Sequence, residues 1–288
     1  MYPTDFDYYR PKTVAEAMDL LRKNKDAKVL AGGHSLLPAM KLRTSMPSAL
    51  VDIGRIKALA GITATKTTLK IGALTTHATI AASDVVKTRC PILAEAAAHI
   101  GDQQVRNRGT IGGSLAHADP AADFPTVILA LGATLTATSP RGKREIPAQK
   151  FFIDLFTTAL KPGELLTSIS VPVMTARMGG AYLKHSHPAS RFAVVGLAAL
   201  VGLKGSTCSR VSLVVGGAMA KPVHAMAAEM ALTGQEPSEA NIASAAATVA
   251  EAITDPLSDV YASGEYRMHL ATVMAKRALM LAVERAKG

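Results

Sequence analysis

The chain has 288 residues, enough for one large domain or two ordinary ones, and 49% of them are hydrophobic although only 4% are aromatic. The net charge of +10 would attract polyanions such as nucleic acid, but the basic residues occur in small groups without interleaved aromatic residues, which argues against a dedicated nucleic-acid binder. The surplus charge therefore predicts either a solvated surface or a docking face for acidic partner subunits.

The cysteines and the apolar segments limit the class of protein further. Cys90 and Cys208 are far apart in the sequence, so they predict neither a disulfide framework nor the clustered thiolates of an iron–sulfur site. The first residues contain no apolar segment typical of a secretory signal, and the longest apolar run, residues 192–203, is too short to span a membrane. The histidines show no spacing typical of a metal site. These features predict a soluble, cytoplasmic protein that binds no metal ion itself.

The N-terminal part of the chain predicts a helix and two short strands. Residues 13–16, Thr-Val-Ala-Glu, have the pattern of a capping box, which predicts a helix that ends near Lys23. The apolar runs 28–31 and 50–53 predict buried strands. The first run stops at the pair Gly32-Gly33, so a turn should follow this strand directly.

The middle of the chain mixes strand and helix patterns. Residues 69–73 predict a strand, and residues 75–82 and 91–100 predict helices. Apolar side chains and threonines alternate over residues 133–138, as in a β-strand. Residues 143–146 can return as the partner strand after a short turn. This segment therefore predicts a β-hairpin.

The last third of the chain predicts strands first and helices afterwards. Residues 178–180 look like a joint that contains Met and Gly, and residues 192–203 and 211–217 are strand candidates. The Ala-rich segments that follow predict helices near residues 223–232, 238–253 and 265–286. This order of elements predicts a separate α+β C-terminal domain.

Two glycine pairs have the character of phosphate-binding loops. The first lies in Ala31–Ser35, directly after a predicted strand, and the second lies in Thr110–Ser114. Paired glycines let the main chain approach a phosphate and turn its amides inward, and the Ser and Thr hydroxyls add donors. Neither loop matches the dinucleotide pattern G-x-G-x-x-G or the P-loop pattern. Each pair alone could be an ordinary turn, but together they predict a pyrophosphate held between two loops.

Three segments resemble one known family. Residues 31–38 (AGGHSLLP), 106–113 (RNRGTIGG) and 119–123 (DPAAD) are similar to the FAD-binding medium subunits of the xanthine oxidase family, of the carbon monoxide dehydrogenase type. The resemblance covers essentially the whole chain, including Ala181–Lys184 and Asp259–Arg267. Two matching loops at the expected separation make it specific.

The resemblance implies an α+β fold with two parts. The first is a vanillyl-alcohol-oxidase-like FAD-binding domain, residues 1–176, whose two lobes cover about residues 1–55 and 56–176. The second is the α+β C-terminal domain of the medium-subunit type, residues 177–288. The resemblance implies no catalytic residue on this chain and the following FAD-binding residues: Ala31, Gly32, Gly33, His34, Ser35, Leu36, Thr110, Ile111, Gly112, Gly113, Ser114, His117, Asp123, Leu166 and Lys184.

Some of these residues have ordinary alternative roles. Asp123 matches a family acid near the adenosine ribose, and the alternative is a loop or helix-cap Asp. Lys184 matches a lysine near the flavin ring, where a cation would stabilise the reduced flavin, and the alternative is a surface lysine on a strand. His34 can lend charge to the pyrophosphate or fix the turn by its ring nitrogens.

Three positions depart from the family pattern. Many members have Asn where this chain has Ser114 and His117, and some relatives have Tyr near the flavin at a position close to Phe192. His117 can cap or bind the ligand loop, or it can be structural. The missing hydroxyl at Phe192 would change the polarity beside the flavin.

The resemblance also implies a function. In this family a large subunit oxidises substrate at molybdenum, a small subunit carries two [2Fe–2S] clusters, and the FAD of the medium subunit passes the electrons to an outside acceptor. The chain fits only the last task, because it lacks the cysteine ligands for such clusters. The implied assembly is a dimer of heterotrimers, with the molybdenum cofactor and the clusters on the partner subunits.

Two other classes of function stay open at this point. A free-standing FAD-dependent oxidase or dehydrogenase would oxidise a small substrate on its own flavin. A nucleotide-binding or scaffold protein would show no redox turnover. The sequence does not select the substrate of the complex among carbon monoxide, aldehydes and N-heterocycles, and it does not select the electron acceptor.

Overall fold

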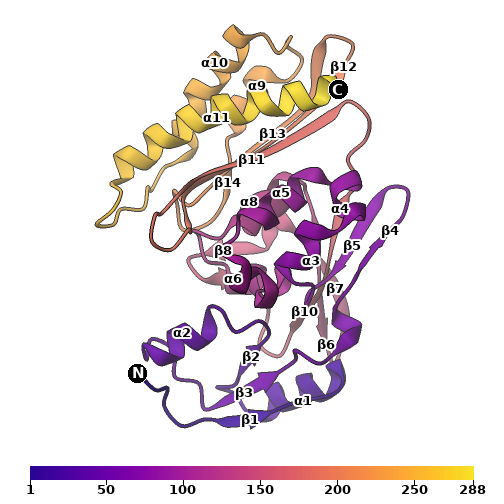
Figure 1. Cartoon of the computed structure of the whole chain (residues 1–288), viewed down its shortest axis with the longest axis vertical. Helices are drawn as coiled ribbons and strands as arrows, with labels where there is room; N and C mark the ends of the chain where they lie inside the picture. The colour runs from indigo at the N-terminus through magenta and orange to yellow at the C-terminus, as the bar shows by residue number, and fades with distance from the viewer.

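The structure is a computed structural model that describes the whole chain, residues 1–288. The chain forms three parts in sequence order along its longest axis (Figure 1). The N-terminus lies in the lowest part of the view and the C-terminus in the uppermost part.

The N-terminal part contains a parallel sheet in the order β1-β3-β2, whose strands are Asp7–Tyr9, Ala49–Asp52 and Lys28–Leu30. Helix α1, Val14–Lys23, packs on this sheet through Ala17 and Met18. Thr13 caps this helix by accepting a hydrogen bond from the Glu16 amide, so the predicted cap and helix end are confirmed. The Glu16 carboxylate accepts from the Lys12 amide and not from that of Thr13, so the capping box is formed only in part. Helix α2, Leu36–Lys41, follows the first glycine pair.

The core of the N-terminal part is small and shared. It contains eight buried residues, and four of them, Ile56, Leu59, Leu74 and Leu165, come from the segments that follow this part in the sequence. The N-terminal part therefore completes its core only when it is docked on the rest of the chain.

The middle part is built on an antiparallel five-stranded sheet. Its order is β4-β5-β10-β6-β7, and the strands are Ile62–Ala64, Thr68–Gly72, Leu165–Pro172, Thr134–Ser139 and Gly142–Pro147. Strands β6 and β7 pair directly, so the predicted hairpin is confirmed. A two-stranded hairpin, β8 and β9, lies at Phe152–Asp154 and Thr157–Thr158.

Six short helices cover this sheet, and five of them contribute buried residues to the largest hydrophobic core. They are α3 (His77–Ala82), α4 (Asp84–Arg89), α5 (Pro91–His99), α6 (Gln103–Arg108), α7 (Ile111–His117) and α8 (Asp123–Ala130). Helices α3 and α5 correspond to the two predicted helices, and Pro91 occupies the first turn of α5, where its missing amide costs no hydrogen bond. Short 3-10 turns lie at Lys57–Leu59 and Ala148–Lys150.

The C-terminal part has a four-stranded antiparallel sheet with helices on one face. The order is β11-β12-β13-β14, and the strands are Met178–Ser186, Ala193–Lys204, Thr207–Gly216 and Val223–His224. The helices are α9 (Met226–Leu232), α10 (Glu239–Ala247) and α11 (Gly264–Lys287), with a 3-10 turn at Thr248–Ala252. The predicted order of strands and then helices is confirmed.

Three details of the C-terminal prediction were wrong. Residues 178–180 are not a joint but the start of β11, where a side chain on Gly179 would overlap the Ala282 carbonyl oxygen of α11. The glycine therefore allows close packing of a helix on a strand. Residues 223–224 form the edge strand β14 before α9, and the helix predicted over residues 238–253 ends at Ala247 in a 3-10 turn.

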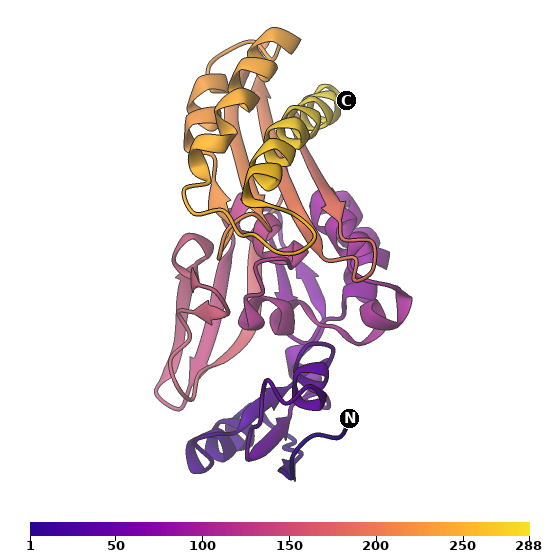
Figure 2. The ribbon, with the colours of Figure 1, turned by 90° about the vertical axis from the view of Figure 1, so that its left-hand side faces the viewer.

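The C-terminal sheet lies between two sets of helices (Figure 2). Helices α5 and α8 of the middle part contact one face, and α11 crosses the other. Arg285 of α11 reaches past the edge of β11 and pairs with Glu95 of α5 at 2.8 Å. The middle and C-terminal parts thus share the sheet as a common layer. None of the helices combines the length and the apolar character needed to cross a membrane.

Candidate cofactor site

The first glycine loop presents a run of free amides. The main-chain amides of Gly32, Gly33, His34 and Ser35 donate to no other main-chain or side-chain atom, and intrahelical bonding resumes at Leu37. Gly33 has a φ of +78°, a left-handed conformation that favours glycine. Four consecutive unpaired amides on a partly exposed loop form a site that suits a diphosphate.

Most amides of the second glycine loop, those of residues 111–114, are already used within the chain. Residues 109–112 run antiparallel to residues 73–77, with hydrogen bonds from Gly112 to Ala73 and from Ile111 to Thr75. The Thr110 hydroxyl accepts from the Gly113 amide at 3.1 Å. The amides of residues 111–114 have partners because α7 begins there and its first amides are bonded within the chain, so the contact of this loop with a pyrophosphate stays a prediction. Contacts from this loop to an anion would come from side chains such as Ser114.

The two loops contact each other through their glycines. A Cβ atom on Gly32 would overlap the Arg108 carbonyl oxygen and lie 2.9 Å from the Cα of Gly109. A Cβ atom on Gly113 would lie 3.8 Å from the Cβ of Ala31. The predicted loops are thus brought together into one cradle, and the absence of side chains is what lets them meet.

His77 supports the second loop from behind, a role that no pattern in the sequence indicates. Its amide donates to the Gly109 carbonyl at 3.0 Å, and its ring packs edge-on against Phe124 at 5.2 Å. The side chain is buried, its Nδ1 has no hydrogen-bond partner, and a Cβ on Gly109 would lie 2.6 Å from its Nε2. Burial, followed by the charges of His34 and Arg106, lowers the pKa of His77 to about 4.

This lowered pKa predicts a pH-dependent stability. Between pH 6.5 and pH 4 the unfolded chain binds a proton at His77 that the folded chain excludes, so the free energy of unfolding should fall as the pH drops through this window. The loss should reach about 3 kcal/mol at pH 4. Urea unfolding of the wild type and of His77→Gln across this window should show the extra slope only in the wild type. The exposed His269→Gln is the matched control, and an equal slope in wild type and His77→Gln would contradict this account.

Asp123 and Lys184 lie together in a buried ion pair. The Lys184 Nζ lies 2.9 Å from Asp123 Oδ1, and the side chains of Lys184 and Asp123 are 2% and 5% exposed. The Tyr182 hydroxyl donates to the same carboxylate at 2.7 Å, and Lys184 Nζ also donates to the Arg191 carbonyl at 2.8 Å. Burial, with the charge of Asp123, raises the pKa of Tyr182 well above its usual value, so the phenol stays a donor.

This ion pair excludes both ordinary alternatives for these residues. Ala122, not Asp123, is the N-cap of α8, so Asp123 is not a helix-cap residue. Lys184 is not a surface lysine, because its charged end is enclosed. Isolated buried charges are costly, and mutual pairing with a further hydrogen bond from Tyr182 offsets that cost. Sequence reasoning did not predict Tyr182 as a member of this group.

A pocket lies between the end of α5 and the end of β11. Its volume is about 410 Å³, and it is lined by Ala98, His99, Ser186, His187, Pro188 and Arg191. Arg191 connects this pocket with two other regions. Its carbonyl accepts a hydrogen bond from Lys184, and its guanidinium donates to the Gly101 carbonyl of the middle part at 3.4 Å. Phe192, the next residue, is 44% exposed. The volume falls within the range of about 300–1,000 Å³ that ligand pockets usually have.

The remaining predicted residues differ in accessibility. Ile111 and Leu166 are buried in the core of the middle part, so neither presents an exposed side chain. His117 packs its ring against Phe156 at 5.0 Å, and burial lowers its pKa. The His34 Nδ1 lies 3.1 Å from the Gly32 carbonyl oxygen, which fixes the turn of the first loop. Leu36 is half-buried at the start of α2.

Known families match both halves of the chain. Residues 4–174 match the family described as the FAD binding domain in molybdopterin dehydrogenase, and residues 181–282 match the CO dehydrogenase flavoprotein C-terminal domain. The chain belongs to the FAD-binding medium subunits of the molybdenum hydroxylases. The predicted family, the predicted fold class and FAD as the cofactor are thereby confirmed.

Individual medium subunits are similar to this chain over almost their whole length. The chain is 40% identical to subunit alpha of the 6-hydroxypseudooxynicotine dehydrogenase complex of Paenarthrobacter nicotinovorans, covering 100% of this chain and 97% of that one. It is also 40% identical to the carbon monoxide dehydrogenase medium chain of Afipia carboxidovorans, covering 100% of both. A solved structure of carbon monoxide dehydrogenase from Hydrogenophaga pseudoflava superposes with a TM-score of 0.96 at 41% identity, covering 99% of each chain.

The residues present in this medium subunit fit FAD. The first loop offers four amides to the two negatively charged phosphates, and any side chain on Gly32 would block the approach of the loops. The pocket between α5 and β11 lies beside the enclosed Lys184, to which the family resemblance assigns a place near the flavin ring.

Proposed function

We propose that the chain carries electrons from the [2Fe–2S] clusters of a partner subunit to an acceptor outside the complex, by means of FAD bound between the two glycine loops. The run of free amides in the first loop carries this proposal. The chain itself offers no thiolates for clusters, because Cys90 and Cys208 are both buried and separate, and burial raises the pKa of the Cys90 thiol to about 12. Electrons must therefore arrive from another polypeptide.

In this proposal the residues of the chain bind and orient the cofactor. The amides of Gly32–Ser35 donate to the pyrophosphate, and the Ser114 side chain approaches it from the second loop. Asp123 holds the charge of Lys184 at one place, and the Arg191 carbonyl fixes the same amine beside the pocket between α5 and β11. The contact of Asp123 with the adenosine ribose that the resemblance implies is not kept in the proposal, because this carboxylate is enclosed and already accepts from Tyr182 and Lys184. Bound FAD supplies a flavin that takes up and releases electrons singly or in pairs.

The proposal includes partner subunits and a division of labour within the chain. The partners are a small iron–sulfur subunit and a large molybdenum subunit in a cytoplasmic dimer of heterotrimers. Residues 1–176 would hold FAD, and residues 177–288 would close the cofactor pocket and contribute to docking. The substrate stays with the large subunit, since two relatives of equal identity, 40%, carry the names of dehydrogenases of different substrates.

The electron-relay role predicts that the isolated chain does not react with substrate. The FAD-loaded chain is mixed anaerobically with the compound that the complete complex oxidises, and the flavin absorbance is recorded with and without the partner subunits. We expect the absorbance to stay constant with the chain alone and to bleach when the partners are present, because only the partners hold the groups that oxidise substrate.

The same experiment separates the relay from a free-standing flavin oxidase. Dithionite added to the isolated chain should bleach the flavin, which shows that the cofactor is competent. If substrate bleaches the chain alone at the rate of the complete complex, the chain is a flavoenzyme in its own right and the relay proposal is wrong.

A further inference from the structure

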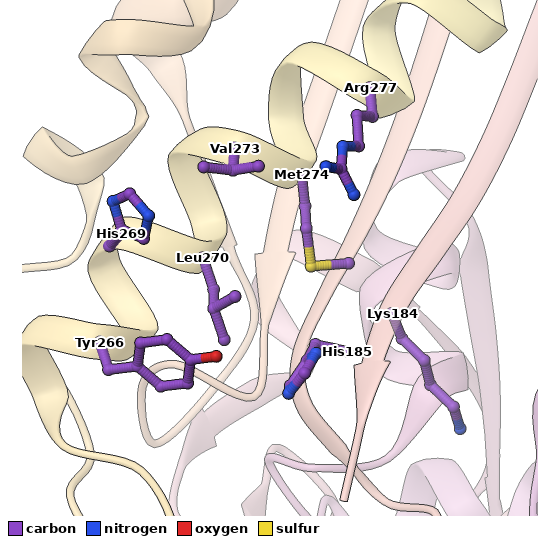
Figure 3. Close-up of a pocket in the computed structure, with 8 residues that line it drawn as sticks. All are labelled: Lys184, His185, Tyr266, His269, Leu270, Val273, Met274 and Arg277. Atoms are coloured by element: carbon purple, nitrogen blue, oxygen red, sulfur yellow. The ribbon is translucent and has the colours of Figure 1, made fainter.

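An open groove lies on the outer side of the C-terminal part, between strand β11 and helix α11 (Figure 3). Its volume is about 280 Å³, and its lining residues are Lys184, His185, Tyr266, His269, Leu270, Val273, Met274 and Arg277. The lining residues of α11 recur every three or four positions, so they share one side of the helix. The groove is separate from the pocket between α5 and β11.

One wall of the groove is the free edge of a sheet. Strand β11 is the outermost strand, and side chains cover only the first half of its open edge. Glu95 accepts from the Tyr182 amide at 3.0 Å, and Arg285 donates to the Gly180 carbonyl at 2.7 Å. Past Tyr182 no such cover is present. The side chain of Lys184 points away from the groove (Figure 3) and is enclosed, yet the residue as a whole is partly exposed, so its main chain is accessible.

The other wall carries an unpaired positive charge. Among the three arginines of α11, Arg267 pairs with Asp259 and Arg285 pairs with Glu95, whereas Arg277 forms no ion pair. The residues one helical turn before and after Arg277, on the same side of α11, are Val273, Met274, Met280 and Leu281, and none of them is acidic. In Figure 3 the Arg277 side chain extends from the helix toward the strand beside Met274. The groove thus combines a cation, the polar Tyr266 and apolar Leu270 and Val273.

We propose that this groove binds a short, extended, acidic segment of a partner subunit, whose main chain continues the sheet at Lys184 and whose carboxylate pairs with Arg277. The inference rests on the proposed assembly with partner subunits. An exposed strand edge recognises an extended main chain, and the unpaired guanidinium selects a carboxylate in bidentate geometry. A single unpaired arginine with an apolar floor favours a peptide over a nucleic acid, which would need a broader basic surface.

The test uses the chain co-expressed with its iron–sulfur and molybdenum subunits. We expect Arg277→Glu to weaken assembly by about tenfold or more, measured by native mass spectrometry over a dilution series, because it places a carboxylate against a carboxylate. Lys287→Glu is the matched control: it makes the same change of charge on the same helix, away from the groove, and should assemble like the wild type. Assembly of Arg277→Glu equal to that of the wild type overturns the inference.

A second measurement needs no variant. Hydrogen exchange of the free chain and of the wild-type complex should show the Lys184 amide and residues 266–277 protected by at least about tenfold in the complex. Unchanged exchange in an intact complex also overturns the inference, and leaves the electron-relay proposal standing. A wild-type chain that never joins an iron–sulfur subunit would instead contradict the proposed function itself.

Discussion

Gly32→Val should yield a chain without flavin. The added side chain would overlap the Arg108 carbonyl oxygen, so the two glycine loops could no longer meet and the free amides of the first loop would move away from the second. Losing two of the charge-assisted hydrogen bonds to the pyrophosphate would remove about 3 kcal/mol, which lowers the affinity for FAD by at least roughly a hundredfold. Flavin content per chain and titration of the apoprotein with FAD measure this loss.

The matched control is a glycine with room for a side chain. A Cβ atom on Gly202 in β12 would lie 3.5 Å from its nearest neighbour, an ordinary van der Waals distance, so Gly202→Ala should keep its flavin. Circular dichroism should show that both variants are folded. A Gly32→Val chain that keeps stoichiometric FAD would move the cofactor to another part of the molecule.

Asp123→Asn should destabilise the protein by about 3–5 kcal/mol, because it leaves the enclosed ammonium of Lys184 without its partner charge. Urea unfolding with saturating FAD, followed by circular dichroism, measures this loss. The exposed pair of Asp19 and Arg22, with a separation of 3.4 Å, is the control. Asp19→Asn should change the free energy of unfolding by less than about 1 kcal/mol.

A double variant distinguishes the ion pair from a simple loss of packing. Lys184→Met removes the buried charge and keeps most of the side-chain volume, so Asp123→Asn together with Lys184→Met should recover most of the lost stability. If the two losses simply add, Asp123 and Lys184 do not stabilise each other and the pairing described here does not hold in solution.

The features of the site that depend on local sequence were predictable. A glycine pair after a strand indicates a positive φ or a close approach of two main-chain segments. Gly33 has the positive φ, and Gly32 allows the close approach. The helix cap at Thr13 and the hairpin of residues 134–147 are likewise set by neighbours in the sequence. Such signals need no knowledge of the tertiary structure.

The features that depend on distant contacts were not predictable from the residues alone. The amide of Gly112 looked available because its partner, the Ala73 carbonyl, is assigned only when residues 73–77 dock beside the loop. The Gly113 amide is different, because the Thr110 side chain that caps it lies only three residues earlier. Asp123 and Lys184 are 61 positions apart, and no pattern in one segment indicates the other. Gly179 looked like a joint because the helix that requires it, α11, lies far later in the chain.

The shared core of the N-terminal part has a consequence for the life of the subunit in the cell. The first glycine loop belongs to this part and the second belongs to the middle part. A ligand that contacts both loops therefore adds its binding free energy to that of the few apolar contacts that hold the two parts together. We therefore expect a newly synthesised chain that has not received FAD to separate at this contact more often and to expose it to proteases and chaperones. Vitamin supply would then set how many copies survive long enough to join a complex.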